Sequence, residues 1–246
     1  MKLAAYVINL DRSLDRLAAF SADAKRAELE FTRVAAVDGR EIPVTERTLL
    51  DEAGFRRDHG KRPMPGEYGC YASHIKVLQL FLEGGADVAL ILEDDAKVPA
   101  DLNAQLDDIL SRDDWDLVKL THHRMTHLKA ERRLASGRTL GRASFGPTGS
   151  SAAYLVKRAA AARLVESLVP MTLPYDVALE RGWAHGIRVR HVRPDVVKPN
   201  IETGRSLTQE EGNYRRMRLK PWRRLTTLRF RTIDFVRRLA GAWARP

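Results

Sequence analysis

Three acidic residues stand side by side directly after a run of apolar residues. Residues 88–92 read Val-Ala-Leu-Ile-Leu, and Glu93, Asp94 and Asp95 follow. The apolar run predicts a buried strand, and ligands bind beyond the carboxyl ends of strands in an open parallel sheet. Adjacent carboxylates repel one another, and their hard oxygens suit Mn²⁺ or Mg²⁺ bound to phosphates. We expect Asp95 to bind such a metal and Glu93 to assist it or hold a substrate; the alternative is a strand-end turn with solvated acids.

The segments around these acids alternate between two patterns. Apolar, strand-like segments lie near residues 3–9, 31–37, 88–92, 115–120, 152–156 and 187–192, and segments with helical spacing separate most of them. With 246 residues, the chain is long enough for a full core. We therefore predict an α/β fold, Rossmann-type, with a mostly parallel sheet and helices on both faces. Residues 121–149 are polar and basic and show no clear period.

The net charge of +10 is concentrated at one end of the chain. Residues 215–246 hold eleven Lys or Arg and one acid, whereas residues 1–214 are neutral. In the basic segment Leu225, Leu228, Leu239 and other apolar residues recur every three or four positions. This pattern predicts a domain over 1–214 and a basic tail over 215–246, whose residues after Pro221 form an amphipathic helix with a break near Arg231 and bind an anionic membrane surface. The alternative is a helix that packs on its own domain with solvated arginines. The neutral body gives no sign of nucleic-acid binding.

Cysteine usage and hydropathy bear on the compartment. Cys70 is the single cysteine, so an internal disulfide is impossible, and we expect it to pack as a small apolar side chain. The first residues do not resemble a secretory signal, and no apolar run reaches the ~20 residues of a membrane span. We expect a cytoplasmic protein, held peripherally on the inner face of the cytoplasmic membrane.

Four segments together resemble a known family. They are INLDRSLDR at 8–16, VAAVDGREI at 34–42, GEYGCYASHIKV at 66–77 and LILEDDAKV at 90–98. In this order they resemble glycosyltransferase family 25, the lipooligosaccharide galactosyltransferases, which also includes collagen galactosyltransferases. The resemblance implies a GT-A fold, a nucleotide-sugar donor, commonly UDP-galactose, and inverting transfer to a saccharide hydroxyl. It also implies a lipid-linked or oligosaccharide acceptor in lipopolysaccharide or lipooligosaccharide biosynthesis.

The resemblance suggests where the donor binds. Residues just past the first two strands would hold the base, ribose and diphosphate, with Arg12 and Arg16 as the diphosphate partners. Arg12 could equally serve ordinary helix-start chemistry, and His74 could be a hydrogen-bonded structural residue. The predicted substrate-binding residues are Asn9, Asp11, Arg12, Arg16, Asp38, Ser73, His74 and Asp94.

Inverting transfer needs a base that takes the acceptor's proton. Asp176 in PYDVALE, at 174–180, is the first choice and Glu180 the second. Asp176 could instead cap its own helix. Two other functions stay open: a transferase that uses another nucleotide-sugar or needs no metal, and a non-catalytic module that binds nucleic acid or anionic lipid. The neutral body and the intact acid cluster count against the second of these.

Overall fold

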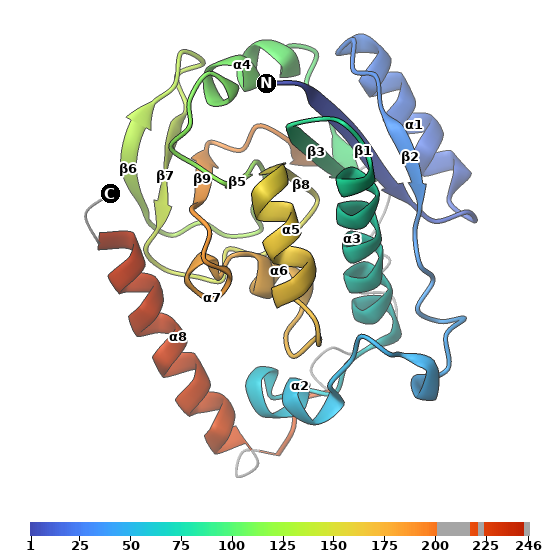
Figure 1. The fold of residues 1–246 in the computed structure, drawn as a ribbon, viewed down its shortest axis with the longest axis vertical. Coiled ribbons are helices and arrows are strands. Elements are labelled where there is room, and N and C mark those ends of the chain that lie inside the picture. Colours follow the sequence, from blue (N-terminus) through green and yellow to red (C-terminus); the bar gives the residue numbers. More distant parts are fainter. Residues whose placement is uncertain (201–216, 221–223, 244–246) are drawn as a thin grey trace.

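The computed structural model describes residues 1–200, 217–220 and 224–243. Within that part, an eight-stranded sheet has the order β2-β1-β3-β8-β5-β9-β7-β6 (Figure 1). Its strands are β1 (Leu3–Asn9), β2 (Thr32–Ala35), β3 (Val88–Glu93), β5 (Leu117–Lys119), β6 (Leu128–Arg133), β7 (Thr139–Ala143), β8 (Ala153–Lys157) and β9 (Val189–Arg193). A separate antiparallel pair joins β4 (Ala96–Lys97) to β10 (Lys198–Pro199).

Helices connect and cover these strands. They are α1 (Leu14–Arg26), α2 (Glu52–His59), α3 (Pro65–Glu83), α4 (Leu102–Leu110), α5 (Arg158–Ser167), α6 (Tyr175–Leu179), α7 (Gly182–His185) and α8 (Leu225–Trp243), together with a short 3₁₀ turn η1 (Val44–Glu46). The first seven precede residue 200, and α8 is the helix predicted at the C-terminal end, without the predicted break near Arg231.

The two-residue period of a strand places a core on each face of the sheet. In β1, Tyr6 and Ile8 pack in the cluster that contains side chains of α3, α5 and α6. Ala5 and Val7 point to the other face, into the cluster that contains side chains of α1 and α4. The predicted α/β class, with helices on both faces of the sheet, is therefore confirmed.

Strand direction brings three chain segments to one edge of the sheet. β1 pairs in parallel with both β2 and β3, so that Asn9 lies beside Ala35 and Ile8 beside Glu93. Parallelism is not continuous across the sheet, because β8 runs antiparallel between β3 and β5, and β9 returns to parallel pairing with β5. The carboxyl ends of β1, β2 and β3 thus meet at the acidic residues.

Residues 121–149 contain a hairpin that the sequence pattern did not predict. β7 pairs antiparallel with β9, and β6 pairs with β7 at the sheet edge. Of this hairpin, β7 buries Leu140 in the core, whereas β6 is mostly exposed and reads LKAERR. An edge strand with two solvated faces lacks apolar alternation, so periodicity could not identify it.

Helix α8 packs along the domain with one face. It contacts α2, α7 and β7 (Figure 1), and Thr227 donates a hydrogen bond to the Arg57 carbonyl over 2.9 Å. Part of the predicted tail, including Trp222, lies outside the described residues. Among the helices that the structure does describe, none combines the length and the hydropathy required to cross a bilayer.

A close glycine contact joins the segment after β2 to helix α3. A Cβ atom on Gly69 would lie 2.6 Å from the Val37 carbonyl oxygen, and one on Gly39 would lie 1.9 Å from the Pro65 oxygen. Both clashes are with backbone atoms, which cannot rotate away. The spacing of DGR and GEYGC therefore reflects two backbones in direct contact at the sheet edge.

This contact predicts that one methyl group added at Gly69 lowers the stability of the fold considerably. We expect Gly69→Ala to lower the free energy of unfolding by about 2–3 kcal/mol, because the backbone of α3 must move away from the loop after β2. Gly85→Ala is the matched control, since its added Cβ meets no atom within 4 Å among the described residues. Urea denaturation of both variants measures the difference, and equal midpoints would contradict the close contact.

Candidate active site

The positive charge among the three acids is an arginine from helix α1. Arg16 Nη2 lies 2.6 Å from Asp94 Oδ1 and 3.0 Å from Asp95 Oδ2, and the arginine is buried. Asn9, at the end of β1, donates a hydrogen bond to the other oxygen of Asp94 over 2.7 Å. Arg16 and Asn9, both predicted to contact the nucleotide, are thus committed to the acid cluster. Asp94 is fixed by both of them.

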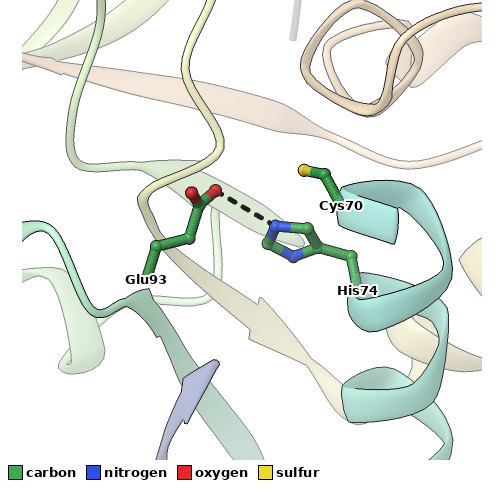
Figure 2. Close-up of side chains that lie close together, drawn as sticks. All are labelled: Cys70, His74 and Glu93. Atoms are coloured by element: carbon green, nitrogen blue, oxygen red, sulfur yellow. Dashed lines mark hydrogen bonds and ion pairs between the residues drawn. The ribbon is translucent and has the colours of Figure 1, made fainter. Parts of the chain in front are cut away.

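Glu93 is held from the opposite side by helix α3 and the loop before β8. Figure 2 shows His74 pointing at Glu93, with Nε2 3.2 Å from Oε1. Ser151 donates to the same oxygen over 2.7 Å. Burial opposes ionisation of Glu93, yet the bonds from His74 and Ser151 lower its pKa. The group therefore stays ionised inside the site.

His74 is positioned by two tyrosines. Its Nδ1 lies 3.1 Å from the Tyr154 hydroxyl, and its ring stacks on Tyr175 at a centroid distance of 4.1 Å. Only 1% of the histidine is exposed. Both ring nitrogens are engaged, which favours the structural alternative for His74: it orients Glu93, and it also forms part of the pocket wall.

Asp95 has the oxygen best suited to a cation. Its Oδ1 is buried and has no hydrogen-bond partner among the described residues. Burial, followed by repulsion from Glu93, raises the pKa of Asp95 to about 7. A divalent cation at this oxygen would relieve both effects, so the carboxylates of Asp95 and Glu93 fit the predicted metal.

A second set of potential ligand atoms overlaps this one. Cys70, His74 and Glu93 place one ligand atom each within 4.8 Å of one another. Figure 2 shows these three side chains close together. Cys70 is less suited to Mn²⁺ or Mg²⁺, because burial, followed by the charge of Glu93, raises the pKa of its thiol well above the usual value. Hard cations also prefer oxygen to sulfur. Glu93 is the residue that both sets share.

One pocket contains most of the predicted donor-binding residues. It lies between the ends of β1, β2 and β3 and the first turns of α3. Eight predicted residues line it: Arg12, Arg16, Asp38, Ser73, His74, Glu93, Asp94 and Asp95.

The predicted residues around the pocket have different surroundings. Arg12 forms an ion pair with Asp38 and remains partly exposed. Ser73 accepts a hydrogen bond from Val37 N over 2.8 Å, so it joins α3 to the segment after β2. Asp11 does not line the pocket; it is exposed and paired with Arg33. Ser73 and Asp11 thus have local structural partners.

The two candidate bases differ sharply. Asp176 lies in the first turn of α6, where its Oδ1 accepts from Val177 N over 2.9 Å; the N-cap of this helix is Pro174, without a side-chain cap bond, so Asp176 is not the predicted cap. Its side chain is partly exposed, burial raises its pKa, and its charge acts on Cys70 in the pocket. Glu180 is fully enclosed and lies 2.5 Å from Lys119 Nζ. Of the two, Asp176 is therefore the base candidate with exposed surface, although it does not line the pocket.

Comparison with known proteins agrees with this geometry. The sequence model of glycosyltransferase family 25 (LPS biosynthesis protein) matches residues 2–179, nearly three quarters of the chain. The chain belongs to glycosyltransferase family 25. The matched region contains the pocket, the acid cluster and Asp176, whereas Glu180 and α8 follow it.

The curated proteins with similar sequences are much longer than this family 25 chain. Human procollagen galactosyltransferase 2 is 26% identical over 149 residues, which is 57% of this chain and 24% of that protein. Procollagen galactosyltransferase 1-B of Xenopus laevis is 29% identical over 129 residues, which is 49% of this chain and 21% of that protein. The family 25 chain therefore spans about a quarter of the length of these relatives.

Several residues of the family 25 site were not predicted from the sequence. Ser151 bonds Glu93, and Tyr154 and Tyr175 fix His74. Two of them lie in GSSAAYLV at 149–156, a segment that resembles the family, but its pattern indicates only a strand. A polar or aromatic residue within a buried strand is the signal that could have identified them.

The raised pKa of Asp95 predicts a pH-dependent stability. A carboxyl whose pKa rises from 3.8 to about 7 on folding favours the native state at low pH and loses that contribution as pH rises through 7. In EDTA, we expect Asp95→Asn to gain roughly 2–4 kcal/mol in unfolding free energy over the wild type between about pH 4 and pH 7.5. Urea denaturation across this range measures it; parallel pH curves would contradict the assignment.

Proposed function

We propose that this chain transfers galactose from UDP-galactose to a saccharide hydroxyl with inversion. The observation that carries the proposal is the acid cluster at the joined ends of β1 and β3, found in a chain of glycosyltransferase family 25. The named relatives are galactosyltransferases, which supports galactose as the sugar. The description of the family supports an acceptor in lipopolysaccharide or lipooligosaccharide biosynthesis.

The donor would lie in the pocket, with its charged groups toward Arg12. This arginine is a partly exposed cation of the rim, which Arg40 also lines, and its partner Asp38 could exchange it for a ribose hydroxyl. Arg16 would add a fixed positive charge to the pocket wall, although its guanidinium is already bound by the carboxylates of Asp94 and Asp95. Arg12 would exchange its ion pair with Asp38 for one with the diphosphate, while Asp38 would accept a hydrogen bond from the ribose. The diphosphate could then enter without leaving either side chain without a polar partner.

Asp95 and Glu93 would hold Mn²⁺ or Mg²⁺ beside the diphosphate. When bound, the ion supplies neutralisation of the charge that develops on the leaving group. The protein's own part is to keep both carboxylates in place: Arg16 fixes Asp95, and His74 and Ser151 fix Glu93. The partnerless Oδ1 of Asp95 supports this assignment.

Asp176 would act as the general base. Its raised pKa brings its proton affinity closer to that needed to accept a hydroxyl proton near neutral pH. Its position beside Gly149, where a Cβ atom would lie 3.6 Å from Oδ2, puts it at the loop that carries Ser151 to Glu93. The acid cluster and the base would therefore approach the substrates from two different elements.

A panel of labelled UDP-sugars tests the function directly. Purified protein with Mn²⁺ is expected to transfer galactose in preference to glucose or N-acetylglucosamine, and both EDTA and Asp95→Ala are expected to reduce turnover by about 100-fold or more. Lipooligosaccharide and a procollagen peptide serve as alternative acceptors. Transfer of another sugar would correct the donor. Absence of any UDP–Mn²⁺ thermal stabilisation would favour a non-catalytic binding module.

Replacement of the proposed base isolates the proton transfer. Asp176→Asn keeps an oxygen for the Val177 amide but cannot accept a proton, so we expect turnover to fall by about 100-fold or more. UDP affinity, measured by calorimetry, should stay within about twofold, because Asn preserves the bond from the Val177 amide and the neighbouring loop. Near-normal turnover would remove Asp176 from the chemistry.

We also propose that α8 holds the protein on an anionic membrane surface, on the cytoplasmic side, where a lipid-linked acceptor would lie. Its packed side carries Thr227, Arg238 and Ala242. Another side carries a stripe of apolar side chains with exposed fractions of 57–70%, namely Leu225, Leu228, Val236 and Trp243, and Lys129 Nζ of β6 lies 4.8 Å from the Trp243 ring centroid.

The arginines on the same helix as this stripe would favour anionic lipids. Arg229 and Arg237 are exposed on the same helix, and each basic residue near an anionic leaflet contributes about 1 kcal/mol. Apolar side chains flanked by arginines suit insertion at the lipid headgroup level. The two alternatives from the sequence are thus compatible, because one face of α8 packs on the domain and the other is free to bind lipid.

Substitutions on the outward stripe test the membrane proposal without removing the helix. We expect Leu228→Ser with Val236→Ser to lower the partition coefficient onto phosphatidylglycerol–phosphatidylcholine vesicles by about 30-fold or more, since each change removes about 1–2 kcal/mol of apolar transfer energy. Val44→Ser is the control, because Val44 is 61% exposed elsewhere on the surface. Equal flotation of the three proteins would exclude this stripe as the lipid-binding face.

A further inference from the structure

Glu180 forms the centre of a buried polar network behind the active site. Its side chain is fully enclosed and accepts hydrogen bonds from the Thr148 amide over 2.8 Å, the Gly149 amide over 3.0 Å and Lys119. Burial by itself would raise the pKa of Glu180, but the charges of Lys119 and other cations lower it to about 2. The network therefore holds an ionised carboxylate against two consecutive backbone N–H groups.

Those N–H groups belong to a loop with an unusual backbone. Gly149 and Ser150 have φ values of +72° and +66°, so two consecutive residues adopt the left-handed region. For serine this conformation is costly and persists only where surrounding contacts impose it. The bonds to Glu180 are such contacts, because they fix the loop at the residues just before and at this turn.

The same loop ends on the acid cluster. Ser151 Oγ donates to Glu93, and the Ala152 carbonyl accepts from the Glu93 amide over 2.9 Å. Gly149 faces Asp176. A change in the path of residues 148–151 would therefore move groups that contact both the proposed metal ligand and the proposed base.

Helix α8 provides the remaining partner of Glu180. Arg238 Nη1 lies 3.1 Å from Glu180 Oε2, and only 3% of this arginine is exposed. Its guanidinium also occupies the space beside Gly146, where an added Cβ would lie 2.6 Å from Nη1. One turn earlier, Phe235 stacks on Phe145 at 6.0 Å. Two side chains of α8 thus contact the segment that leads into the loop.

Glu180 and Arg238 lie outside the region that the family model matches. The match ends at residue 179, immediately before Glu180, and α8 lies well beyond it. Arg238 and Glu180 come from segments 58 residues apart in sequence. Neither belongs to the pocket that contains the acid cluster.

We propose that Arg238 and Glu180 are positioning residues for sugar transfer, which makes α8 part of the catalytic unit. Arg238 fixes Glu180, Glu180 fixes residues 148–151, and that loop fixes Glu93 relative to Asp176. The inference rests on the proposed transferase function. It gives α8 two roles: the face that packs on the domain would position the active site, and the exposed apolar face would bind lipid.

The test uses Arg238→Met in the full chain, with Arg112→Met, at an exposed arginine just after α4, as the matched control. Turnover should fall by about tenfold or more, because misplaced groups lose catalytic alignment, while the KM for UDP-galactose changes by less than about threefold. Hydrogen exchange of a peptide covering 145–152 should accelerate, whereas exchange of 3–9 stays as in the wild type. Arg238→Lys, which keeps the charge, should recover part of both effects.

The outcomes separate this inference from the function it rests on. A wild type without transferase activity would overturn the proposed function. Faster hydrogen exchange of residues 145–152 in Arg238→Met would still show that Arg238 holds this loop. An active wild type together with normal turnover and normal exchange in Arg238→Met would overturn the inference. If Arg238→Met does not fold, the milder Glu180→Gln and Arg238→Lys carry the same comparison, and wild-type behaviour in both would also overturn it.

Discussion

The site depends on the neutralisation of three adjacent carboxylates at the end of a buried strand. Such a cluster repels itself strongly away from water, so each acid needs a specific partner. Arg16 and Asn9 supply these for Asp94, and His74 and Ser151 do so for Glu93. Asp95 is left only partly compensated, with one oxygen that lacks a bond among the described residues. The incomplete compensation is what gives this corner its capacity for a cation.

The partners come from elements that only the tertiary fold brings together. Arg16 belongs to α1, His74 to α3 and Ser151 to the loop before β8. Parallel pairing of β1 with β3 places Asn9 near Asp94 although 85 residues separate them. The glycine contact at Gly69 sets the distance between α3 and the sheet edge. The charge balance of the acids is thus a product of the topology and not of the local sequence.

Periodicity and composition predicted the α/β class and the strand before the acids, because each has a strong local pattern. The edge strand β6 was not predicted, because its two solvated faces carry no apolar alternation. Arg16 was assigned to the diphosphate because a loop arginine suits phosphate, whereas its partners are the acids that the same reasoning gave to a metal. Residue type indicates what a side chain can bind, but only the fold decides which partner is within reach.

The separation of 58 residues between Arg238 and Glu180 has a consequence for biosynthesis. The ribosome makes Glu180 and the loop before it ahead of α8, so a nascent domain first holds this carboxylate with Lys119 and the backbone amides of residues 148 and 149 but without Arg238. If Arg238 fixes Glu180 as proposed, residues 148–151 settle fully when α8 docks. A partly translated chain would then hold a sheet and an acid cluster but an immature catalytic centre, and maturation would coincide with the arrival of the helix that is proposed to bind lipid.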